Sequence, residues 1–418
     1  MSDLAKNMKI RETYAATMQR RKSQHVCVVT VKVQENKLNR QQAQQLKMCF
    51  VEAKWLRNYV LSLSNEGKTD IFKLDYTDFK EVVHYDKDKN EIHSKLENLS
   101  AQMKQDVITD IRNNIKGLAK AKAKGLEVGN LKFVSEYTAI NLKQAGCTHK
   151  IVGKNKIKIQ GIKKPLKVNG LDQIEKRFKS YELANAKLIL KPSGYYIALT
   201  LMIPNEESLI IEKKETIGID MGCETSFTLS NGDKQFFYVE ESERTKKLQR
   251  KLERTQKGSN NRWKVIKQLR KAYEKDSNRK DDAAKKYCSK LKDKQVIIQD
   301  EQLANWQQLG HGKKVQHSIM GRVKSRLIND GAIVLSKWIP TTKFCNKCGN
   351  KIDITQEERT FVCPHCGHTE DRDIHAAKNM IWFYENIVGV ERTEYSPAAF
   401  KDTLNKLFDA QEAAKSLA

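Results

Sequence analysis

The sequence predicts a multidomain α/β protein, and three observations lead to this fold class. The chain has 418 residues, whereas a single hydrophobic core stops growing at about 250–300 residues. Segments that alternate like strands and segments with helical periodicity follow one another along the chain. Four of its nine cysteines lie close together near the C-terminal end. We therefore expect at least two domains and a small metal-binding module.

The first half is predicted to begin as a β module that a helical segment interrupts. Residues 25–34, HVCVVTVKVQ, alternate and are rich in β-branched side chains, as in a strand. Apolar residues then recur at helical spacing over 41–63. A less regular helical pattern continues over 90–124, and strands are expected again from about Lys132.

The β module is predicted to resume after the helical segment. Lysine alternates with isoleucine over 154–159, which predicts a strand with ammonium groups on one face. Residues 186–204 predict a hairpin that turns at Pro192, Ser193 and Gly194. The predicted boundaries are a β module at 1–35 and 129–213, with a helical insertion at 36–128.

The second half is predicted to form another α/β domain. Three short strands are expected over 216–241, with tight turns at Met221–Gly222 and Asn231–Gly232. The remaining predicted elements are charged helices at about 242–292, a buried strand within 296–303, a helix at 317–330, a strand at 331–339 and a final helix at 371–387. The predicted boundaries are 214–340 for this domain with its basic helical insert, 341–369 for the cysteine module, 370–388 for the final helix and 389–418 for a poorly ordered tail.

The net charge of +26 predicts a nucleic-acid partner. A lysine-rich surface that is merely solvated is the alternative, but the charge is clustered. Between Lys116 and Lys167 the chain has 13 lysines and two acidic residues, and between Glu241 and Gln295 it has 20 basic and eight acidic residues. Clustering of this kind favours polyanion binding.

Membrane insertion and secretion are not expected. The sequence has no run of about 18 apolar residues, which a membrane span needs, and its first residues lack the apolar core of a signal peptide. The chain is therefore expected in the cytosol. Five cysteines stand alone and are expected to be free, mostly buried thiols: Cys27, Cys49, Cys147, Cys223 and Cys288.

The clustered cysteines predict a structural zinc site. They form two C-x-x-C pairs separated by 14 residues, and Gly349 and Gly367 follow the pairs. A two-residue spacing lets both sulfurs reach one ion, and four thiolates close its coordination shell. His365 and His368 are alternative ligands, but they are redundant once four thiolates are present. The predicted zinc ligands are Cys345, Cys348, Cys363 and Cys366.

Acidic residues mark the ends of several predicted elements in the second half. Asp220 closes an apolar strand, Glu301 lies near the end of another, and Asp371 and Asp373 begin the final helix. Each alone would more often be a turn former or a helix cap. Carboxylates that converge from strand ends and a packed helix can, however, hold the divalent ions that hydrolyse phosphodiesters.

The motifs GIDMG, E-x-L within VIIQDEQL, TTKFCNKCG, CPHCG and DRDIHAAKN together resemble the RuvC-like nuclease half of the TnpB family. TnpB proteins are transposon-encoded relatives of type V CRISPR effectors. The resemblance covers about residues 216–387. It implies an RNase-H-like (RuvC) nuclease domain with an inserted zinc ribbon, preceded by a β-barrel-like wedge domain that carries a helical recognition lobe.

The resemblance also implies the catalytic residues. Asp220, Glu301 and Asp373 are expected to bind two magnesium or manganese ions. Two positions depart from the family pattern. The family's Glu-Asp-Leu is Glu301-Gln302-Leu303 here, which leaves Asp300 as a rival carboxylate, and His375 stands where the family has Asn.

The implied function is RNA-guided cleavage of DNA. A guide RNA is expected to bind the basic surfaces, and double-stranded target DNA is opened beside a short flanking motif and cut by a single RuvC-like site. A miniature type V effector, a guided repressor that does not cut and a transposase remain alternatives, and the guide, the motif and the oligomeric state stay open. The residues expected to bind nucleic acid are Lys154, Lys156, Lys158, Lys163, Lys164, Lys167, Arg244, Lys246, Lys247, Arg250, Lys251 and Arg254.

Overall fold

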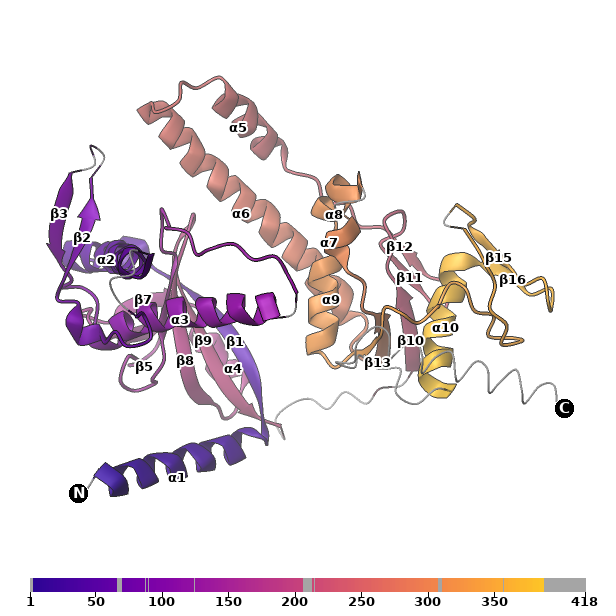
Figure 1. Ribbon diagram of the computed structural model, residues 1–418, viewed down its shortest axis with the longest axis horizontal. Helices are drawn as coiled ribbons and strands as arrows, with labels where there is room; N and C mark the ends of the chain where they lie inside the picture. Colours follow the sequence, from indigo (N-terminus) through magenta and orange to yellow (C-terminus); the bar gives the residue numbers. More distant parts are fainter. Residues whose placement is uncertain are drawn as a thin grey trace. The chain divides into compact units, whose positions relative to one another are not determined.

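The chain forms two compact units, Met1–Leu209 and Ile210–Ala418, which are described separately. The computed structural model describes residues 3–65, 70–86, 88, 90–123, 125–205, 213, 215–306, 310–355 and 357–386 (Figure 1). The tail predicted at 389–418 lies outside these residues. None of the helices described is both long enough and apolar enough to cross a membrane.

The first unit is built on a seven-stranded antiparallel sheet with the order β4-β8-β9-β1-β7-β6-β5. Strand β1 (Gln24–Val33) pairs with β9 (Gly194–Pro204) on one side and with β7 (Leu166–Asn169) on the other. The other strands are β4 (Ala139–Leu142), β5 (His149–Ile151), β6 (Lys156–Ile159) and β8 (Glu182–Lys191). The first and last strands of this order, β4 and β5, follow each other in the chain, and an isolated bridge joins Ala145 to His149 of β5. The sheet is thus consistent with the expected barrel-like module.

The segment between β1 and β4 contains two long helices, α2 (Arg40–Asn65) and α3 (Ala101–Ala123), and the hairpin of β2 (Glu81–Tyr85) and β3 (Glu91–Lys95). Further helices complete the unit: α1 (Asp3–Arg21), which the sequence did not predict, η1 (Glu35–Lys37), η2 (Tyr76–Asp78) and α4 (Asp172–Arg177).

Two predictions for the first unit are wrong. Residues 91–95, predicted as helix, form β3, because every residue of this segment pairs with a residue of β2. The strand expected from Lys132 begins only at Ala139. Before it, the Asn58 side chain of α2 accepts from the Val134 amide at 3.0 Å and donates to the Val134 carbonyl at 2.9 Å. The Asn58 side chain therefore forms the hydrogen bonds that a neighbouring strand would otherwise form with the backbone of Val134.

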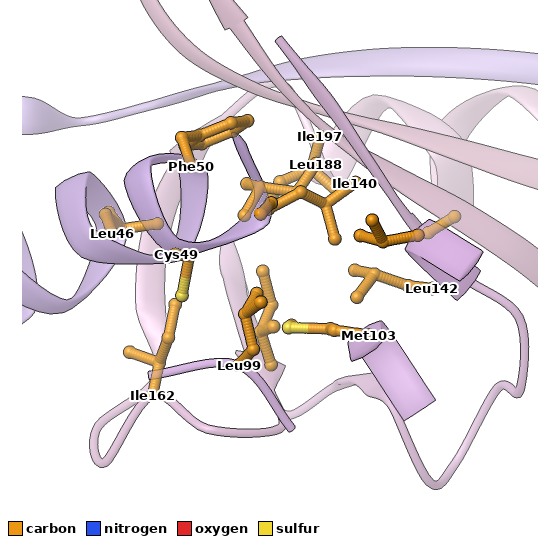
Figure 2. Packing of buried hydrophobic residues seen from close by; sticks show 14 of the residues in the cluster. Leu46, Cys49, Phe50, Leu99, Met103, Ile140, Leu142, Ile162, Leu188 and Ile197 are labelled. Atoms are coloured by element: carbon orange, nitrogen blue, oxygen red, sulfur yellow. The ribbon is translucent and has the colours of Figure 1, made fainter. Parts of the chain in front are cut away.

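One continuous core joins the helices to the sheet. Leu46, Cys49 and Phe50 of α2 pack with sheet residues such as Leu188 and Ile197 (Figure 2). The apolar face predicted for the helix at 41–63 is the face that is buried here. The helical segment is therefore stabilised by the sheet on which it packs rather than by a core of its own.

The second unit contains a five-stranded sheet with the order β12-β11-β10-β13-β14. Strand β10 (Glu215–Asp220) is antiparallel to β11 (Phe227–Leu229), which pairs with β12 (Lys234–Gln235). On its other side β10 is parallel to β13 (Lys294–Gln299), and β13 is parallel to β14 (Ile333–Leu335). Ile217, Ile219, Ile297 and Ile298 are fully buried, as apolar runs in central parallel strands predict.

Helices and a small hairpin surround this sheet. The helices are α5 (Glu243–Glu253), α6 (Asn260–Ser289), α7 (Leu303–Trp306), α8 (Gly312–His317), α9 (Met320–Asn329) and α10 (Arg372–Asn386). Strands β15 (Thr360–Val362) and β16 (Thr369–Asp371) form a hairpin before α10, and the second cysteine pair lies in the turn between these two strands. The strand predicted within 296–303 ends at Gln299, so Glu301 lies just beyond it rather than inside it.

Candidate metal and nucleic-acid sites

Two of the predicted carboxylates follow neighbouring parallel strands. Ile219 of β10 pairs with Ile298 of β13, so both strands end at the same edge of the sheet. Asp220 is the last residue of β10, and Glu301 comes two residues after the end of β13. Ligand sites in sheets of parallel strands commonly form at this edge. The fold therefore brings together two residues that lie far apart in the sequence.

Helix α10 brings the third carboxylate to this edge because it packs directly against β10. At Gly218, a Cβ atom would lie 2.0 Å from the carbonyl oxygen of Ala377 in α10. Only a residue without a side chain permits this approach. Gly218 was not among the predicted site residues, although a glycine inside a buried apolar strand is a signal of close backbone contact.

The two acidic residues at the start of α10 have different contacts. Asp371 accepts hydrogen bonds from the amides of Asp373 (3.2 Å) and Ile374 (3.1 Å) and forms an ion pair with Lys234 (2.7 Å). It therefore caps the helix. The carboxylate of Asp373 accepts from the Arg372 guanidinium at 3.0 and 3.2 Å. Of the two, Asp373 is the one whose charge is among the largest causes of the raised pKa of Asp220.

The charges of the predicted trio are coupled. Burial raises the pKa of Asp220 well above its ordinary value, and the nearby carboxylates of Asp373 and Glu301 raise it further, while Arg372 opposes them. The oxygens of the three side chains do not all lie within 4.8 Å of one another. Three carboxylates that repel one another at a sheet edge suit a hard divalent cation, because its charge would offset theirs.

Asp300 and Glu301, the rivals for the second carboxylate, differ in their partners. Asp300 accepts from the Lys324 ammonium at 2.8 Å, and Lys324 also donates to the Glu301 carbonyl at 2.7 Å. Burial raises the pKa of Glu301. The positive charge of Lys324 lowers this pKa, and the negative charge of Asp300 raises it. In the part of the chain that is described, the Glu301 side chain forms no hydrogen bond. Asp300 is therefore engaged in a structural ion pair, whereas Glu301 is available as a ligand.

His375, the second departure from the family pattern, belongs to the contact between α10 and the cysteine module. It is fully buried, its Nε2 lies 2.8 Å from the Phe344 carbonyl, and its ring stacks on Phe361 at 3.8 Å between centroids. Asn379, one turn later, donates to the same carbonyl at 2.7 Å. His375 thus anchors the segment that precedes Cys345.

The four clustered cysteines can hold one metal ion. All four sulfurs lie within 4.8 Å of one another. Cys345 and Cys366 are 3.7 Å apart, and Cys348 and Cys363 are 3.5 Å apart, measured between Sγ atoms. A tetrahedral ion with metal–sulfur bonds of about 2.3 Å separates its sulfurs by about 3.8 Å. The geometry therefore fits zinc.

The glycines after each cysteine pair close tight turns around the cysteines. Gly349 and Gly367 have φ angles of 72° and 73°, and their amides donate to the carbonyls of Cys345 and Cys363. Burial raises the pKa of Cys363, but hydrogen bonds from the amides of Cys366 and His365 outweigh this and lower it to about 7. Among the five isolated cysteines, only Cys49 and Cys288 are buried, so the expectation of mostly buried thiols is wrong.

Replacing Cys345 with serine is expected to release one zinc equivalent per chain and to destabilise the hairpin. The reason is that a structural zinc ion contributes directly to the folding free energy. Cys147→Ser, at an exposed cysteine of the other unit, is the control. Metal analysis and thermal unfolding of the pure proteins check this, and wild-type protein without zinc would contradict it.

Strands β5, β6 and β7 carry a face of lysines. Lys150 pairs with Lys158 and Lys156 pairs with Lys167 across these antiparallel strands, so all four lie on one face. Like charges directly opposite each other destabilise a sheet unless a counterion is present. We call Lys150, Lys156, Lys158 and Lys167 the lysine face. Lys150 was not predicted, because it lies on β5, outside the alternating run at 154–159.

The structure corrects two of the predicted lysines on β6. Lys154 lies in the turn before the strand rather than within it, and is exposed. The Lys158 ammonium donates to the carbonyls of Ile162 and Lys163, at 2.6 and 2.5 Å, so it holds the turn after the strand. Lys163 and Lys164 are exposed in that turn.

Helix α5 carries the second group of predicted basic residues. Leu248 packs with residues of α6, which fixes the apolar side of α5. Lys246 is paired with Glu240 (2.8 Å) and Glu243 (3.4 Å). The other predicted residues are exposed: Arg244, Lys247, Arg250 and Lys251 on α5, and Arg254, the residue that follows the helix. These five are placed to contact a polyanion, whereas Lys246 is neutralised within the chain.

Two family models match this chain. A model described as "Probable transposase" matches residues 207–303. A model described as "Cas12f1-like, TNB domain" matches residues 329–380. The first match contains Asp220 and Glu301, and the second contains the four cysteines and Asp373.

A curated protein and a solved structure illustrate what the chain is similar to. A "Putative RNA-guided DNA endonuclease" of Streptomyces pristinaespiralis is 28% identical over 178 residues, which are 40% of this chain and 44% of that protein. The chain thus spans less than half the length of this relative. A chain of a cryo-EM structure of a Cas12f1–sgRNA–target DNA complex is 13% identical and matches over 85% of this chain and 98% of that one. Its TM-score of 0.25 is too low for a comparison of folds.

Proposed function

This chain belongs to the TnpB-like family, and we propose that it is an RNA-guided, metal-dependent DNA endonuclease with a single RuvC-like site. The observation that carries the proposal is the convergence of Asp220, Glu301 and Asp373 at one sheet edge, where their charges are coupled. Its partners would be a guide RNA and double-stranded target DNA. Such a nuclease would act on DNA in the cytoplasm of a prokaryotic cell.

The sheet of the second unit supports an RNase-H-like assignment. Three antiparallel strands, β12, β11 and β10, are continued by two parallel strands, β13 and β14. We assign residues 214–340 and 370–388 to a RuvC-like domain with a basic insert at 242–292, and 341–369 to a zinc ribbon. In the first unit we assign the sheet to a wedge domain and 36–128 to a recognition lobe.

We further propose that Asp220, Glu301 and Asp373 hold two magnesium or manganese ions. Oxygen donors and three like charges are the donor set that these hard ions prefer. When bound, such ions activate water and stabilise the leaving oxygen of a phosphodiester. Arg372 donates a hydrogen bond to the Asp373 carboxylate and so fixes its position. Lys324 forms an ion pair with Asp300, which leaves Glu301 as the metal ligand.

The flanking motif would be read by the protein and the target sequence by base pairing with the guide. In this division of roles, the protein mainly contacts the phosphate backbones of RNA and DNA, and it contacts few bases. The lysine face and the exposed basic residues of α5 are suited to such contacts, because each offers a row of cations to the phosphates.

Replacing Lys150, Lys156 and Lys167 with glutamine is expected to weaken guide RNA binding. The salt slope of log K should fall by about 0.7–0.9 for each phosphate that these lysines no longer neutralise. Lys158 is kept, because it holds a turn. Filter binding at several salt concentrations measures both quantities.

A control triple at exposed lysines elsewhere in the unit, Lys73, Lys95 and Lys176, removes the same charge. If the lysine face only protects the edge strand β5 from aggregation, the first triple will lower solubility and leave affinity and slope unchanged. That result would show that the lysine face does not bind the guide RNA.

Sequencing the RNA that copurifies with the expressed protein tests the guide. Expression together with the native flanking DNA is expected to enrich one RNA species with a constant scaffold and a variable end. Recovery of cellular RNA in proportion to its abundance would contradict a dedicated guide.

A miniature type V CRISPR effector of the same chemistry is the second candidate. The match of residues 329–380 to the Cas12f1-like domain favours it. The source of the copurifying RNA distinguishes the two, because a type V effector would bind a transcript of a CRISPR array and a transposon nuclease a transcript of the transposon end.

A further inference from the structure

We propose that His368, Glu370 and His375 form a second site for a divalent transition-metal ion, distinct from the four cysteines. One ligand atom from each residue lies within 4.8 Å of the other two. Glu370 belongs to β16 and His375 to α10, while His368 follows the second cysteine pair. Two imidazoles and one carboxylate are a donor set for zinc and related ions.

The contacts of His375 direct one nitrogen at the site. Its Nε2 lies 2.8 Å from the Phe344 carbonyl, which can only accept, so Nε2 carries the hydrogen. In the neutral ring Nδ1 then offers a lone pair, and it faces Oε2 of Glu370 at 3.4 Å. The ring is fully buried and stacked on Phe361, so it cannot turn this nitrogen away.

Glu370 and His368 complete the arrangement. The Lys378 ammonium contacts Oε1 of Glu370, which leaves Oε2 for the site. Nε2 of His368 lies 3.5 Å from this Oε2, and it is buried without a hydrogen-bond partner among the residues described. Two nitrogens and one carboxylate oxygen therefore converge, and the hydrogen bond between His375 and Glu370 is long at 3.4 Å.

The spacing of these atoms matches that of metal ligands. A tetrahedral ion with bonds of about 2.1 Å to nitrogen and oxygen separates its ligands by about 3.4 Å. The measured separations from Oε2 of Glu370 are 3.4 Å to His375 and 3.5 Å to His368. Water would supply the fourth ligand on the side where His368 is partly exposed.

An ion at this position would join the cysteine module to α10. His368 and Glu370 lie on the module side, whereas His375 lies just beyond Asp373 on the helix. The ion would thus stabilise the docking of the helix that carries Asp373. The ion would be structural, so its ligands would stay the same during DNA cleavage.

Counting cobalt ions by equilibrium dialysis tests the proposal. Asp220→Ala is introduced into all full-length proteins, because it weakens metal binding by the carboxylate trio. The parent should bind two ions per chain, and His368→Ala should bind one. The ion that is lost should lack the sulfur-to-cobalt charge-transfer absorption of a thiolate site, and the ion that remains should show it.

His365→Ala is the matched control, since this exposed histidine lies on the same turn outside the cluster. It should keep both ions. Glu370→Gln should lose the same ion as His368→Ala, and circular dichroism reports whether each variant is folded. One ion in the parent, or equal numbers in the parent and in folded His368→Ala, would overturn the proposal and show that Glu370 only accepts hydrogen bonds from the histidines.

Discussion

Glu301→Gln is expected to abolish DNA cleavage, whereas Asp300→Asn, at the adjacent residue, should leave most of it. The amide of Gln has the size of the carboxylate but lacks its charge, so it cannot replace a ligand of a hard divalent ion. The expected loss is more than about 100-fold in rate, because even residues that only orient a metal ligand cost about 10–100-fold. Asp300→Asn removes the ion pair with Lys324, and its main effect should be on stability.

Cleavage rates at saturating guide and target, with magnesium in excess, separate the two variants. Filter binding should show that both still bind guide and target, because neither change touches the basic surfaces. Lost cleavage in Asp300→Asn together with retained cleavage in Glu301→Gln would show that Asp300 is the ligand and that the Lys324 ion pair opens when metal binds.

Gly218→Ala is expected to remove cleavage without removing any functional side chain. The added Cβ would lie 2.0 Å from the Ala377 carbonyl, so β10 and α10 must separate by roughly 1.4 Å to reach an ordinary contact of 3.4 Å. The added Cβ lies on a central strand and the Ala377 oxygen lies on a helix, so neither can move easily. Overpacking of this kind lowers the free energy of unfolding by about 1–3 kcal/mol or more. The separation would also move Asp373 away from Asp220.

Gly321→Ala provides a matched control in the same unit. Its Cβ would meet only a side-chain atom of Leu303 at 3.6 Å, and alanine favours the helix α9 in which it lies. Thermal unfolding should therefore shift down for Gly218→Ala and stay or rise for Gly321→Ala. An active, equally stable Gly218→Ala protein would show that α10 does not need this close packing.

The sequence predicted those parts of the fold that local pattern determines. Buried strands β10 and β13 were visible as apolar runs, and the cysteine spacing with Gly349 and Gly367 predicted a metal site whose geometry the structure contains. Residues 91–95 were assigned to a helix because a short segment has weak periodicity, and only its pairing with β2 makes it a strand.

The sequence could not assign roles to neighbouring residues of the same type. Asp371 and Asp373 are equally good helix caps, and only the contacts separate the cap from the residue that couples to Asp220. Alternation predicted the direction of Lys158 but not the carbonyls of the following turn that bind its ammonium group. The His368–Glu370–His375 cluster was missed because its residues converge from three segments.

If the proposed function is correct, one carboxylate site cuts DNA that a bound RNA selects. The direct measurement is cleavage by the reconstituted RNA–protein complex of two DNA targets with the same flanking motif, each matched to one of two guides. Cleavage should follow the guide, require magnesium or manganese, and disappear in Asp220→Ala while target binding persists. Cleavage that does not depend on the guide would show that the bound RNA does not select the target, and cleavage by Asp220→Ala would show that this carboxylate site does not cut.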